Sequence, residues 1–406
     1  MKEIKQAVIF AGGLGERLKP FTETNPKPMY PVQGKPFLEY LAGQVRDWGI
    51  TDIVVLLGYL PEKIMDYFGD GSRLGVHFTW CVTPVEYDTQ FRLKAAEPYL
   101  KDDFLMMYCD NLCPVNFQRI REEYERNGAW IQVSVYSNED GYTKNNVRLA
   151  EDGKVLVYDK KRVTEGLQGV DIGYALVSKQ VLSLMSGENE NFEAVVYPKL
   201  VEQGKLYATV TRHRYYSIGS FDRIRLTEQY LSGQKYIFLD RDGTLNERPP
   251  KAEYIRRPED FRWLPGAKEA VKRLCDAGYK IIMISNQAGI ARGVMTEQDY
   301  EDVQDKMIAD LGEIGAQIEK AYHCPHGWDS PCECRKPKPG MLYEAQKDYS
   351  IDLTKCVMIG DDIRDIQTAH NADMKGILVD ESYTLADAVE DVLNGRIRDT
   401  EVQEGA

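Results

Sequence analysis

Short apolar runs alternate with amphipathic stretches along the chain. The clearest runs lie at 7–10, 53–57, 104–108, 236–239, 281–284 and 357–359. Each has the length of a buried strand, and the amphipathic stretches between them are long enough to form helices. This pattern is typical of mainly parallel sheets covered by helices on both faces. The sequence therefore predicts the α/β fold class.

The pattern of a first strand followed by chemically active residues occurs twice. The run 7–10 leads into Gly12 and Gly13, and the run 236–239 leads into Asp240. Ligands of open α/β sheets bind at the carboxyl ends of strands. A chain of 406 residues also exceeds the size of most single cores. We expect two doubly wound domains, 1–232 and 233–394, and a flexible tail over 395–406.

Composition and charge restrict the class of partner. Hydrophobic residues make up 43% and charged residues 28% of the chain, as in soluble globular proteins. A net charge of -13 argues against nucleic acid or an anionic membrane as the main partner. No apolar run approaches membrane-spanning length, and the N-terminus lacks an export signal, so we expect a cytoplasmic protein. Small phosphorylated substrates remain compatible, and homo-oligomerisation stays open.

A glycine-rich run follows the first strand. Residues 11–28 read A-G-G-L-G-E-R-L-K-P-F-T-E-T-N-P-K-P. Gly12, Gly13 and Gly15 would let backbone N–H groups approach a polyphosphate closely. Arg17 and Lys27 would add positive charge near its α- and β-phosphates. A glycine turn alone often only reverses the chain, but the two cations at these offsets favour phosphate binding.

This run resembles the G-G-x-G-x-R-L and P-K-P signature of sugar-1-phosphate nucleotidyltransferases, over roughly the first 230 residues. The resemblance implies a Rossmann-like mixed sheet, Mg²⁺ bound by Asp110, and a sugar phosphate held by Lys160, with Lys161 as the second candidate. It also implies that a sugar-1-phosphate oxygen attacks the α-phosphate of a nucleoside triphosphate and releases pyrophosphate. Positioning and charge neutralisation would provide the catalysis.

Two departures from that family bear on activity. Bulky residues at 88–93 (D-T-Q-F-R-L) replace small ones, so we expect a different base or sugar pocket. Ser217 stands where the family has a second metal-binding Asp, and Asp222 is close but shifted. A hydroxyl is a weaker Mg²⁺ ligand than a carboxylate. An alternative hypothesis is therefore a degenerate first domain that senses nucleotide or sugar phosphate, and another is nucleotidyl transfer from CTP to a phosphorylated polyol.

Paired carboxylates follow the first strand of the second domain. Asp240 and Asp242 are two residues apart in F-L-D-R-D-G-T-L. One carboxylate can attack phosphorus while the other protonates the leaving alcohol and later activates water. Ser285 and Asn286 after a second strand could hold phosphoryl oxygens, and Lys336 could offset negative charge.

The order of these elements, completed by Asp361, resembles the HAD superfamily of phosphatases. The resemblance implies a Rossmann-like domain with Asp240 as nucleophile and Asp242 as general acid/base. It implies Mg²⁺ ligands from Asp240, the Asp242 carbonyl and Asp361. Asp365 would orient neighbouring groups.

Four soft or borderline metal ligands occur within one short segment: Cys324, His326, Cys332 and Cys334. This set matches a closed tetrahedral Zn²⁺ site. Three free thiols and an unrelated histidine are the competing interpretation. With four protein ligands the zinc would be structural, and the loop would place Arg335 and Lys336 beside the nucleophile.

Within the superfamily, such a loop occurs in heptose bisphosphate phosphatases and in histidinol-phosphate phosphatases. The run 286–293 (N-Q-A-G-I-A-R-G) is more similar to the heptose branch, although Asp362 stands where that branch commonly has a lysine. Together the halves predict an enzyme that dephosphorylates D-glycero-D-manno-heptose 1,7-bisphosphate and then forms a nucleotide-activated heptose for capsule or lipopolysaccharide synthesis. We expect GTP first, with CTP open; a histidinol-phosphate phosphatase is the alternative.

Overall fold

The computed structural model describes residues 3–250 and 253–402. The chain divides into two compact units, Met1–Leu231 and Ser232–Ala406. Each unit has its own sheet and its own buried cores. The two are described separately below.

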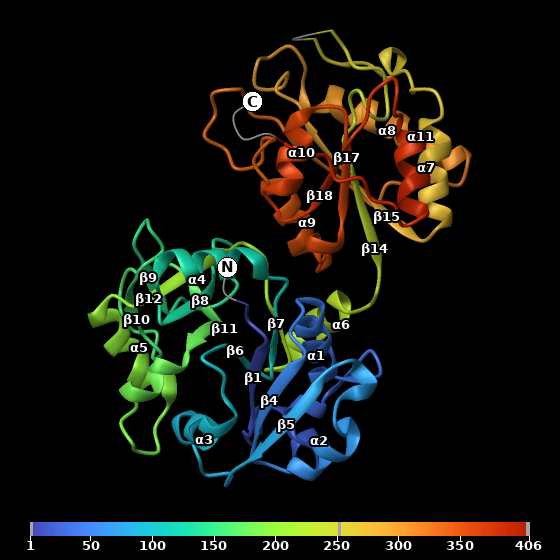
Figure 1. The fold of residues 1–406 in the computed structure, drawn as a ribbon. Helices are drawn as coiled ribbons and strands as arrows, with labels where there is room; N and C mark the ends of the chain where they lie inside the picture. The colour runs from blue at the N-terminus through green and yellow to red at the C-terminus, as the bar shows by residue number, and fades with distance from the viewer. Residues whose placement is uncertain (1–2, 251–252, 403–406) are drawn as a thin grey trace. The chain divides into compact units, whose positions relative to one another are not determined.

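The first unit is built on a seven-stranded mixed sheet (Figure 1). In spatial order its strands are β12 (Leu206–Thr211), β8 (Ile131–Tyr136), β11 (Val170–Ser178), β6 (Asp103–Tyr108), β1 (Gln6–Ala11), β4 (Asp52–Leu57) and β5 (His77–Val82). β11 runs antiparallel to both its neighbours, and the other pairs are parallel. Because β1 is flanked by β4 and β6, the glycine-rich run leaves from the middle of the sheet.

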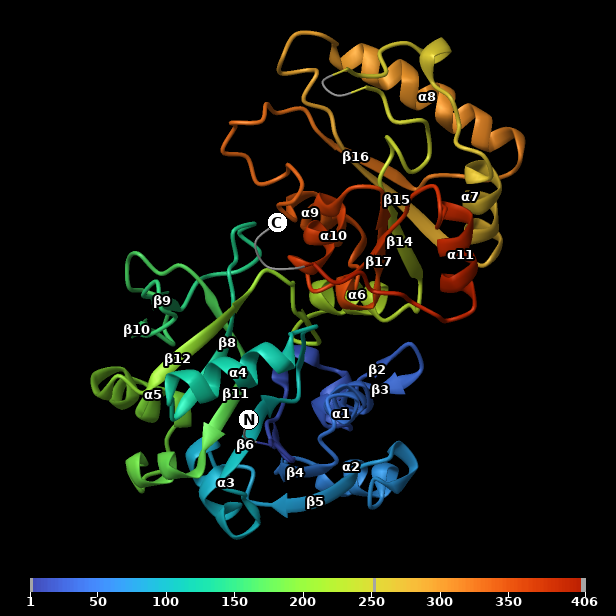
Figure 2. The same ribbon diagram turned by 45° about the horizontal axis from the view of Figure 1, so that its top comes forward.

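Amphipathic helices cover both faces of this sheet. The helices are α1 (Phe37–Asp47), α2 (Pro61–Phe68), α3 (Thr89–Ala95), α4 (Phe117–Asn127), α5 (Phe192–Gln203) and α6 (Phe221–Tyr230). α1, α2 and α4 contribute to one apolar core, whereas α3 and α5 contribute to the core on the opposite face. Figure 2 shows α4 lying across β8 and β11. The predicted α/β layering is confirmed for this unit.

Short strand pairs extend this unit beyond the main sheet. They are β2 (Pro31–Val32) with β3 (Lys35–Pro36), β7 (Asn111–Leu112) with β13 (Tyr216–Ser217), and β9 (Val147–Leu149) with β10 (Val155–Tyr158). The β7 and β13 pair matters for the site, because it brings the end of the domain back to the residues that follow β6.

The second unit contains a five-stranded parallel sheet. In spatial order its strands are β16 (Lys320–Cys324), β15 (Tyr279–Asn286), β14 (Lys235–Leu239), β17 (Val357–Gly360) and β18 (Lys375–Leu378). β14 is central and is paired in parallel with β15 and β17. The carboxyl ends of these three strands therefore meet at one edge of the sheet.

Helices also cover both faces of this second sheet. They are α7 (Ala267–Asp276), α8 (Glu297–Glu313), α9 (Gly340–Tyr349), α10 (Ile363–His370) and α11 (Leu385–Leu393). α7, α8 and α11 pack into one core, and α9 packs with β14 to β17 residues in the other. Figure 1 shows α9 and α10 on one side of the sheet and α7 and α11 on the other. This unit also has the predicted doubly wound architecture.

Part of the segment expected to be a flexible tail is anchored. The Thr400 N–H donates to the Gly376 carbonyl at 2.8 Å, and the Gly376 N–H donates to the Asp399 carboxylate at 2.9 Å. These bonds satisfy backbone groups along β18, which is an edge strand. Residues 403–406 of the expected tail lie outside the described residues.

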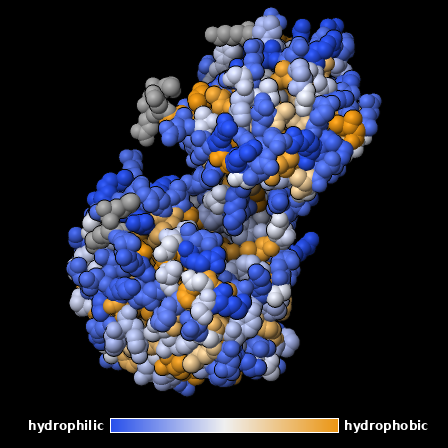
Figure 3. Space-filling model, turned by 45° about the vertical axis from the view of Figure 1, so that its right-hand side comes forward, coloured by the Kyte–Doolittle hydropathy of each residue, from blue (hydrophilic) through white to orange (hydrophobic). Residues whose placement is uncertain are grey.

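The face of the molecule shown in Figure 3 is mainly hydrophilic, with hydrophobic residues singly or in small groups. Among the helices of residues 3–250 and 253–402, none has the length and apolar character needed to cross a membrane.

Candidate functional sites

The glycine-rich loop of the first unit passes close to Lys27. Gly15 has a φ of 65°, a left-handed conformation that favours glycine. A Cβ at this position would lie 3.0 Å from the Lys27 Cβ. The loop therefore needs glycine here for both conformation and space, because the Lys27 side chain packs directly against it.

Lys27 and Asp110 form an ion pair at the carboxyl edge of the first sheet. Lys27 is buried, and Asp110 lies just after β6. The two predicted residues therefore meet, although 83 positions separate them. Such a pair sets a cation and a carboxylate side by side, as a site for a metal-bound polyphosphate requires.

Ser217 and Arg17 lie at this same place. Ser217 is paired with Asn111 through β13 and β7, and the Ile218 N–H donates to the Asp110 carbonyl at 3.1 Å. A Cβ at Gly219 would lie 3.6 Å from the Ser217 Oγ and 3.7 Å from the Arg17 Nη2. The structure thus pairs Lys27 with Asp110, places Ser217 opposite the neighbouring Asn111, and brings the Arg17 guanidinium close to Gly219.

Asp222 lies in the first turn of α6. Within the described residues no cluster of three or more His, Cys, Asp or Glu ligands forms around Asp110. A Mg²⁺ ion there would need substrate phosphate oxygens and water to complete its six ligands, as Mg²⁺ commonly does.

Lys160 belongs to a charged cluster on the same unit. Its Nζ lies 2.6 Å from the Glu193 Oε2 and also contacts Asn191. Asp171 on β11 lies in this cluster, and burial, reinforced by the negative charge of Glu193, raises the pKa of Asp171 well above its usual range. Lys160 and Lys161 are both exposed, but only Lys160 is paired with an acidic group of this cluster. The sequence did not predict Glu193, because no local motif links it to Lys160.

Arg92 is one of the bulky residues at 88–93 that were expected to alter the base or sugar pocket. Its side chain is buried, with the residue only 4% exposed. The guanidinium donates to the carbonyls of Leu57 (2.8 Å), Gly12 (3.2 Å) and Val85 (2.9 Å) and to the Thr83 Oγ1 (2.6 Å). A Cβ at Gly12 would lie 2.3 Å from the Arg92 Nη1. Arg92 therefore stabilises the start of the glycine-rich loop through the Gly12 carbonyl, and its side chain does not project into solvent.

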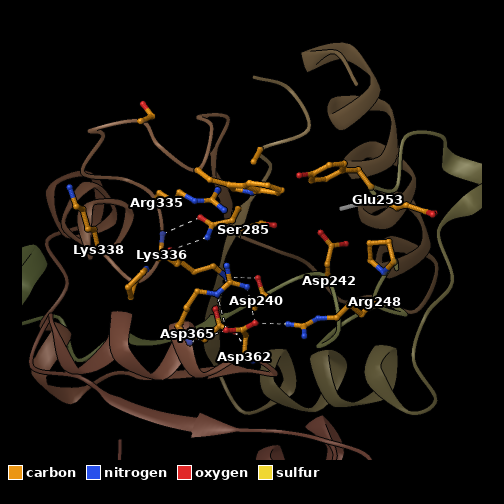
Figure 4. Close-up of a pocket in the computed structure, with 18 of the residues that line it drawn as sticks. Asp240, Asp242, Arg248, Glu253, Ser285, Arg335, Lys336, Lys338, Asp362 and Asp365 are labelled. Atoms are coloured by element: carbon orange, nitrogen blue, oxygen red, sulfur yellow. Dashed lines mark hydrogen bonds and ion pairs between the residues drawn. The ribbon is translucent and has the colours of Figure 1, made fainter. Parts of the chain in front are cut away.

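The second unit has a cavity of about 910 Å³ at the carboxyl edge of its sheet. Asp240, Asp242, Ser285, Asn286 and Lys336 all line it. Figure 4 shows the labelled side chains of Asp240, Asp242, Ser285 and Lys336 lining one pocket from different loops. The predicted phosphatase residues are thus brought together, and Arg335 lines the same cavity.

Lys336 bridges two carboxylates at the base of this cavity. Its Nζ lies 2.5 Å from the Asp240 Oδ1 and 2.6 Å from the Asp365 Oδ1. Burial raises the pKa of Asp240, because it penalises the charged form more than Lys336 favours it. The same two carboxylates raise the pKa of Lys336 against its burial. A nucleophilic Asp240 must be ionised, so the site requires the lysine and a further positive charge.

A magnesium ion would supply that further charge. Ligand atoms of Asp240, Asp361 and Asp365 lie within 4.8 Å of one another. The Asp361 Oδ1 is buried without a hydrogen-bond partner in the described part of the chain. Burial also raises the pKa of Asp361 to about 6. An unpartnered carboxylate oxygen facing two more carboxylates fits a hard divalent cation.

Asp242 is held by a separate set of donors. Its carboxylate receives hydrogen bonds from Arg241 (2.9 and 3.1 Å), Asn246 (3.1 Å) and Gln287 (2.9 Å). Although burial opposes ionisation, these donors lower the pKa of Asp242. Gln287 also donates to the Ser285 Oγ at 2.7 Å. None of these donors was expected to hold Asp242, although Arg241 stands between the two aspartates.

The four predicted zinc ligands converge. The His326 Nδ1 lies 3.2 Å from the Cys334 Sγ and 3.5 Å from the Cys324 Sγ, which is 3.7 Å from the Cys332 Sγ. All four ligand atoms lie within 4.8 Å of one another. The cluster is compatible with zinc in its donor set and closeness. Arg335 and Lys336 follow it directly, and the Lys336 N–H donates to the Asn286 Oδ1 at 3.1 Å.

Comparisons with known proteins match the two units of the chain to two different families. The model of the family described as nucleotidyl transferase matches residues 6–225, and the model described as HAD-hydrolase-like matches residues 333–402. The D-glycero-beta-D-manno-heptose-1,7-bisphosphate 7-phosphatase of Haemophilus ducreyi is 39% identical over 150 residues, which cover 35% of this chain and 81% of that protein.

Another relative is the D-glycero-alpha-D-manno-heptose-1,7-bisphosphate 7-phosphatase of Photorhabdus laumondii. It is 41% identical over 145 residues, which cover 34% of this chain and 78% of that protein. A crystal structure of HddC from Yersinia pseudotuberculosis complexed with GMP-PN has a TM-score of 0.47 and 25% identity, covering 55% of this chain and 97% of that one.

Proposed function

Because the chain belongs to the nucleotidyl transferase family in its first unit and to the heptose-1,7-bisphosphate 7-phosphatase family in its second, we propose that it catalyses two consecutive steps of nucleotide-sugar synthesis. The observation that carries this proposal is a pair of separate phosphate-handling sites. One is built around Lys27 and Asp110, and the other around Asp240 and Lys336.

In the second unit, Asp240 attacks the phosphorus of a phosphate ester, and the bond between phosphorus and the sugar oxygen breaks. The negative charge of the bound phosphate ester opposes the donors that keep Asp242 ionised, so Asp242 takes up a proton when the ester binds. It gives this proton to the departing oxygen and then removes a proton from the water that cleaves the aspartyl phosphate. Ser285, Asn286 and Lys336 bind the phosphoryl oxygens. Magnesium, held by Asp240, Asp361 and the Asp242 carbonyl, would neutralise charge on the phosphate when bound.

In the first unit, an oxygen of a sugar 1-phosphate attacks the α-phosphorus of a nucleoside triphosphate, and pyrophosphate leaves. The glycine-rich loop positions the polyphosphate, and Arg17 and Lys27 stabilise the negative charge that develops. Lys160 holds the phosphate of the sugar. Magnesium at Asp110 would neutralise phosphate charge when bound.

The chemistry orders the two steps. Removal of the 7-phosphate from D-glycero-D-manno-heptose 1,7-bisphosphate leaves the anomeric phosphate, which is the acceptor that the first unit needs. The relatives include phosphatases named for the alpha and for the beta anomer, at similar identity. The assay with both anomers of the bisphosphate, described next, decides which anomer this enzyme prefers.

The test of the phosphatase is a panel assay. Phosphate release is measured with both heptose 1,7-bisphosphate anomers, fructose 1,6-bisphosphate and histidinol phosphate, each with Mg²⁺. We expect the highest kcat/KM with one of the two heptose bisphosphates. A higher value with histidinol phosphate would reassign the substrate.

The test of the transferase follows on the dephosphorylated product. Pyrophosphate release is measured with GTP, CTP, ATP and UTP, and we expect turnover with one of them, GTP first. A sensing first unit, which the replacement of an aspartate by Ser217 favours, predicts binding without release for every nucleotide. Turnover of a polyol phosphate with CTP above that of the heptose would select the polyol alternative.

The cysteine and histidine cluster has a structural role in this proposal. Zinc bound by Cys324, His326, Cys332 and Cys334 would keep no open position for substrate. It would hold the loop that presents Arg335 and Lys336 to the cavity.

A further inference from the structure

A pair of arginines lies on the rim of the phosphatase cavity outside the catalytic groups. Arg248 follows the loop after β14, and Arg364 lies in the first turn of α10; both line the cavity. Their side chains are 49% and 47% exposed, so both guanidinium groups reach solvent. Neither residue has a role in the reaction described above.

Asp362 holds the two arginines in one place. The Arg364 Nε and Nη2 bind the Asp362 Oδ1 and Oδ2 at 2.9 and 2.8 Å, a bidentate pair. The Arg248 Nη2 binds the same Oδ2 at 3.0 Å, while its Nε binds the Asp361 Oδ2 at 2.9 Å. Figure 4 shows Arg248 pointing toward Asp362 from the opposite side of the pocket.

Two carboxylates pair with the two guanidinium groups of this cluster. Asp362 binds both arginines, and Asp361 binds Arg248 through its Oδ2 while its free Oδ1 faces the metal position. The Nη1 of each arginine makes no hydrogen bond to the part of the chain that the structure describes. Two guanidinium groups that are already oriented by ion pairs and still have free N–H donors suit a phosphate group, which arginine binds well.

We propose that Arg248 and Arg364, held by Asp362, bind the phosphate of the substrate that Asp240 does not attack. This assignment rests on the proposed phosphatase function and specifies it: the arginines select bisphosphorylated sugars over monophosphates. They are specificity residues, and the reacting phosphate stays with Ser285, Asn286 and Lys336.

The experiment compares heptose 1,7-bisphosphate with heptose 7-phosphate, which carries the reacting phosphate alone. For the double variant Arg248→Ala/Arg364→Ala, we expect the KM for the bisphosphate to rise about 10-fold or more, because charge-assisted hydrogen bonds are lost. The kcat for the bisphosphate and the kcat/KM for the monophosphate stay within about twofold of wild type. The double lysine variant, which keeps the charge, restores part of the affinity.

Arg257→Ala is the matched control, since Arg257 is an exposed arginine paired with Asp260 that does not line the cavity. It should change neither substrate's kinetics. An equal loss on both substrates would place the arginines on the reacting phosphate, and no loss on either would make them structural; both results overturn the proposal. No phosphate release by the wild type from the bisphosphate would contradict the proposed function and, with it, this assignment.

Discussion

Gln287 shows how one neutral side chain prepares a catalytic carboxylate. It donates to Asp242 at 2.9 Å and to the Ser285 Oγ at 2.7 Å, and it is fully buried. It thereby links the proposed acid/base to the phosphate-binding hydroxyl. This contact crosses from the loop after β15 to the loop after β14.

We predict that Gln287→Met, which keeps the volume, lowers the kcat for phosphate release by about 10-fold or more. A hydrogen bond to a charged group contributes about 1.5–3 kcal/mol. Steady-state kinetics on the bisphosphate measure the effect, and Gln298→Met, on the exposed start of α8, serves as control. Unchanged kcat would show that Asp242 does not depend on this donor.

A second residue-scale prediction concerns stability and pH. Burial raises the pKa of Asp171, so the folded state retains a proton that the unfolded chain loses near pH 4. The contribution of Asp171 to stability therefore falls as pH rises from about 4 toward neutrality. We expect Asp171→Asn to increase the free energy of unfolding by about 1 kcal/mol at pH 8 and by less at pH 5.

Urea unfolding of the full chain at the two pH values measures this difference. Asp66→Asn on the exposed face of α2 should give none at either pH. A loss of stability in Asp171→Asn at pH 8 would mean that the carboxylate is charged and paired in the folded state.

At the scale of elements, the sequence predicted a site best where its residues lie close together along the chain. The four candidate zinc ligands lie within one short segment, and Asp240 and Asp242 follow a single strand, so their spacing and order predicted which side chains meet. Arg248 was not predictable, because it meets Asp361 and Asp362 from a distant loop.

The orientation of the Arg92 side chain could not be predicted from the sequence. Its size suggested an altered substrate pocket, but side-chain direction depends on α3 packing over Gly12, which spacing alone does not reveal. The same holds for Glu193, which reaches Lys160 from α5.

The zinc loop yields an element-scale prediction. Cys332→Ser should reduce bound zinc from one equivalent to well below one and lower the kcat/KM for phosphate release by about 10-fold or more, because metal binding stabilises the loop that carries Lys336. Pyrophosphate release should not change. Atomic absorption and the two assays measure these effects.

Cys275→Ser is the control, since this thiol lies in the same unit but outside the cluster. Full phosphatase activity in a zinc-free Cys332→Ser protein would show that the loop keeps its form without metal.

At the scale of the whole molecule, the central claim is that two independent catalytic sites reside on one chain. Each unit has its own sheet, and each site forms at the carboxyl edge of that sheet around its own lysine and aspartate pair. Neither site takes a residue from the other unit in the assignments above. The two activities should therefore be separable by single substitutions.

The most direct test measures phosphate release and pyrophosphate release side by side in Asp240→Asn and Lys27→Met. The account predicts that Asp240→Asn lowers the rate of phosphate release by about 1000-fold or more, because this variant lacks the nucleophile of the phosphatase site. Its pyrophosphate release from NTP and heptose 1-phosphate is retained, because the transferase site does not use Asp240. Lys27→Met should show the reverse pattern. Retained phosphate release in Asp240→Asn, or the loss of both activities in either variant, would contradict it.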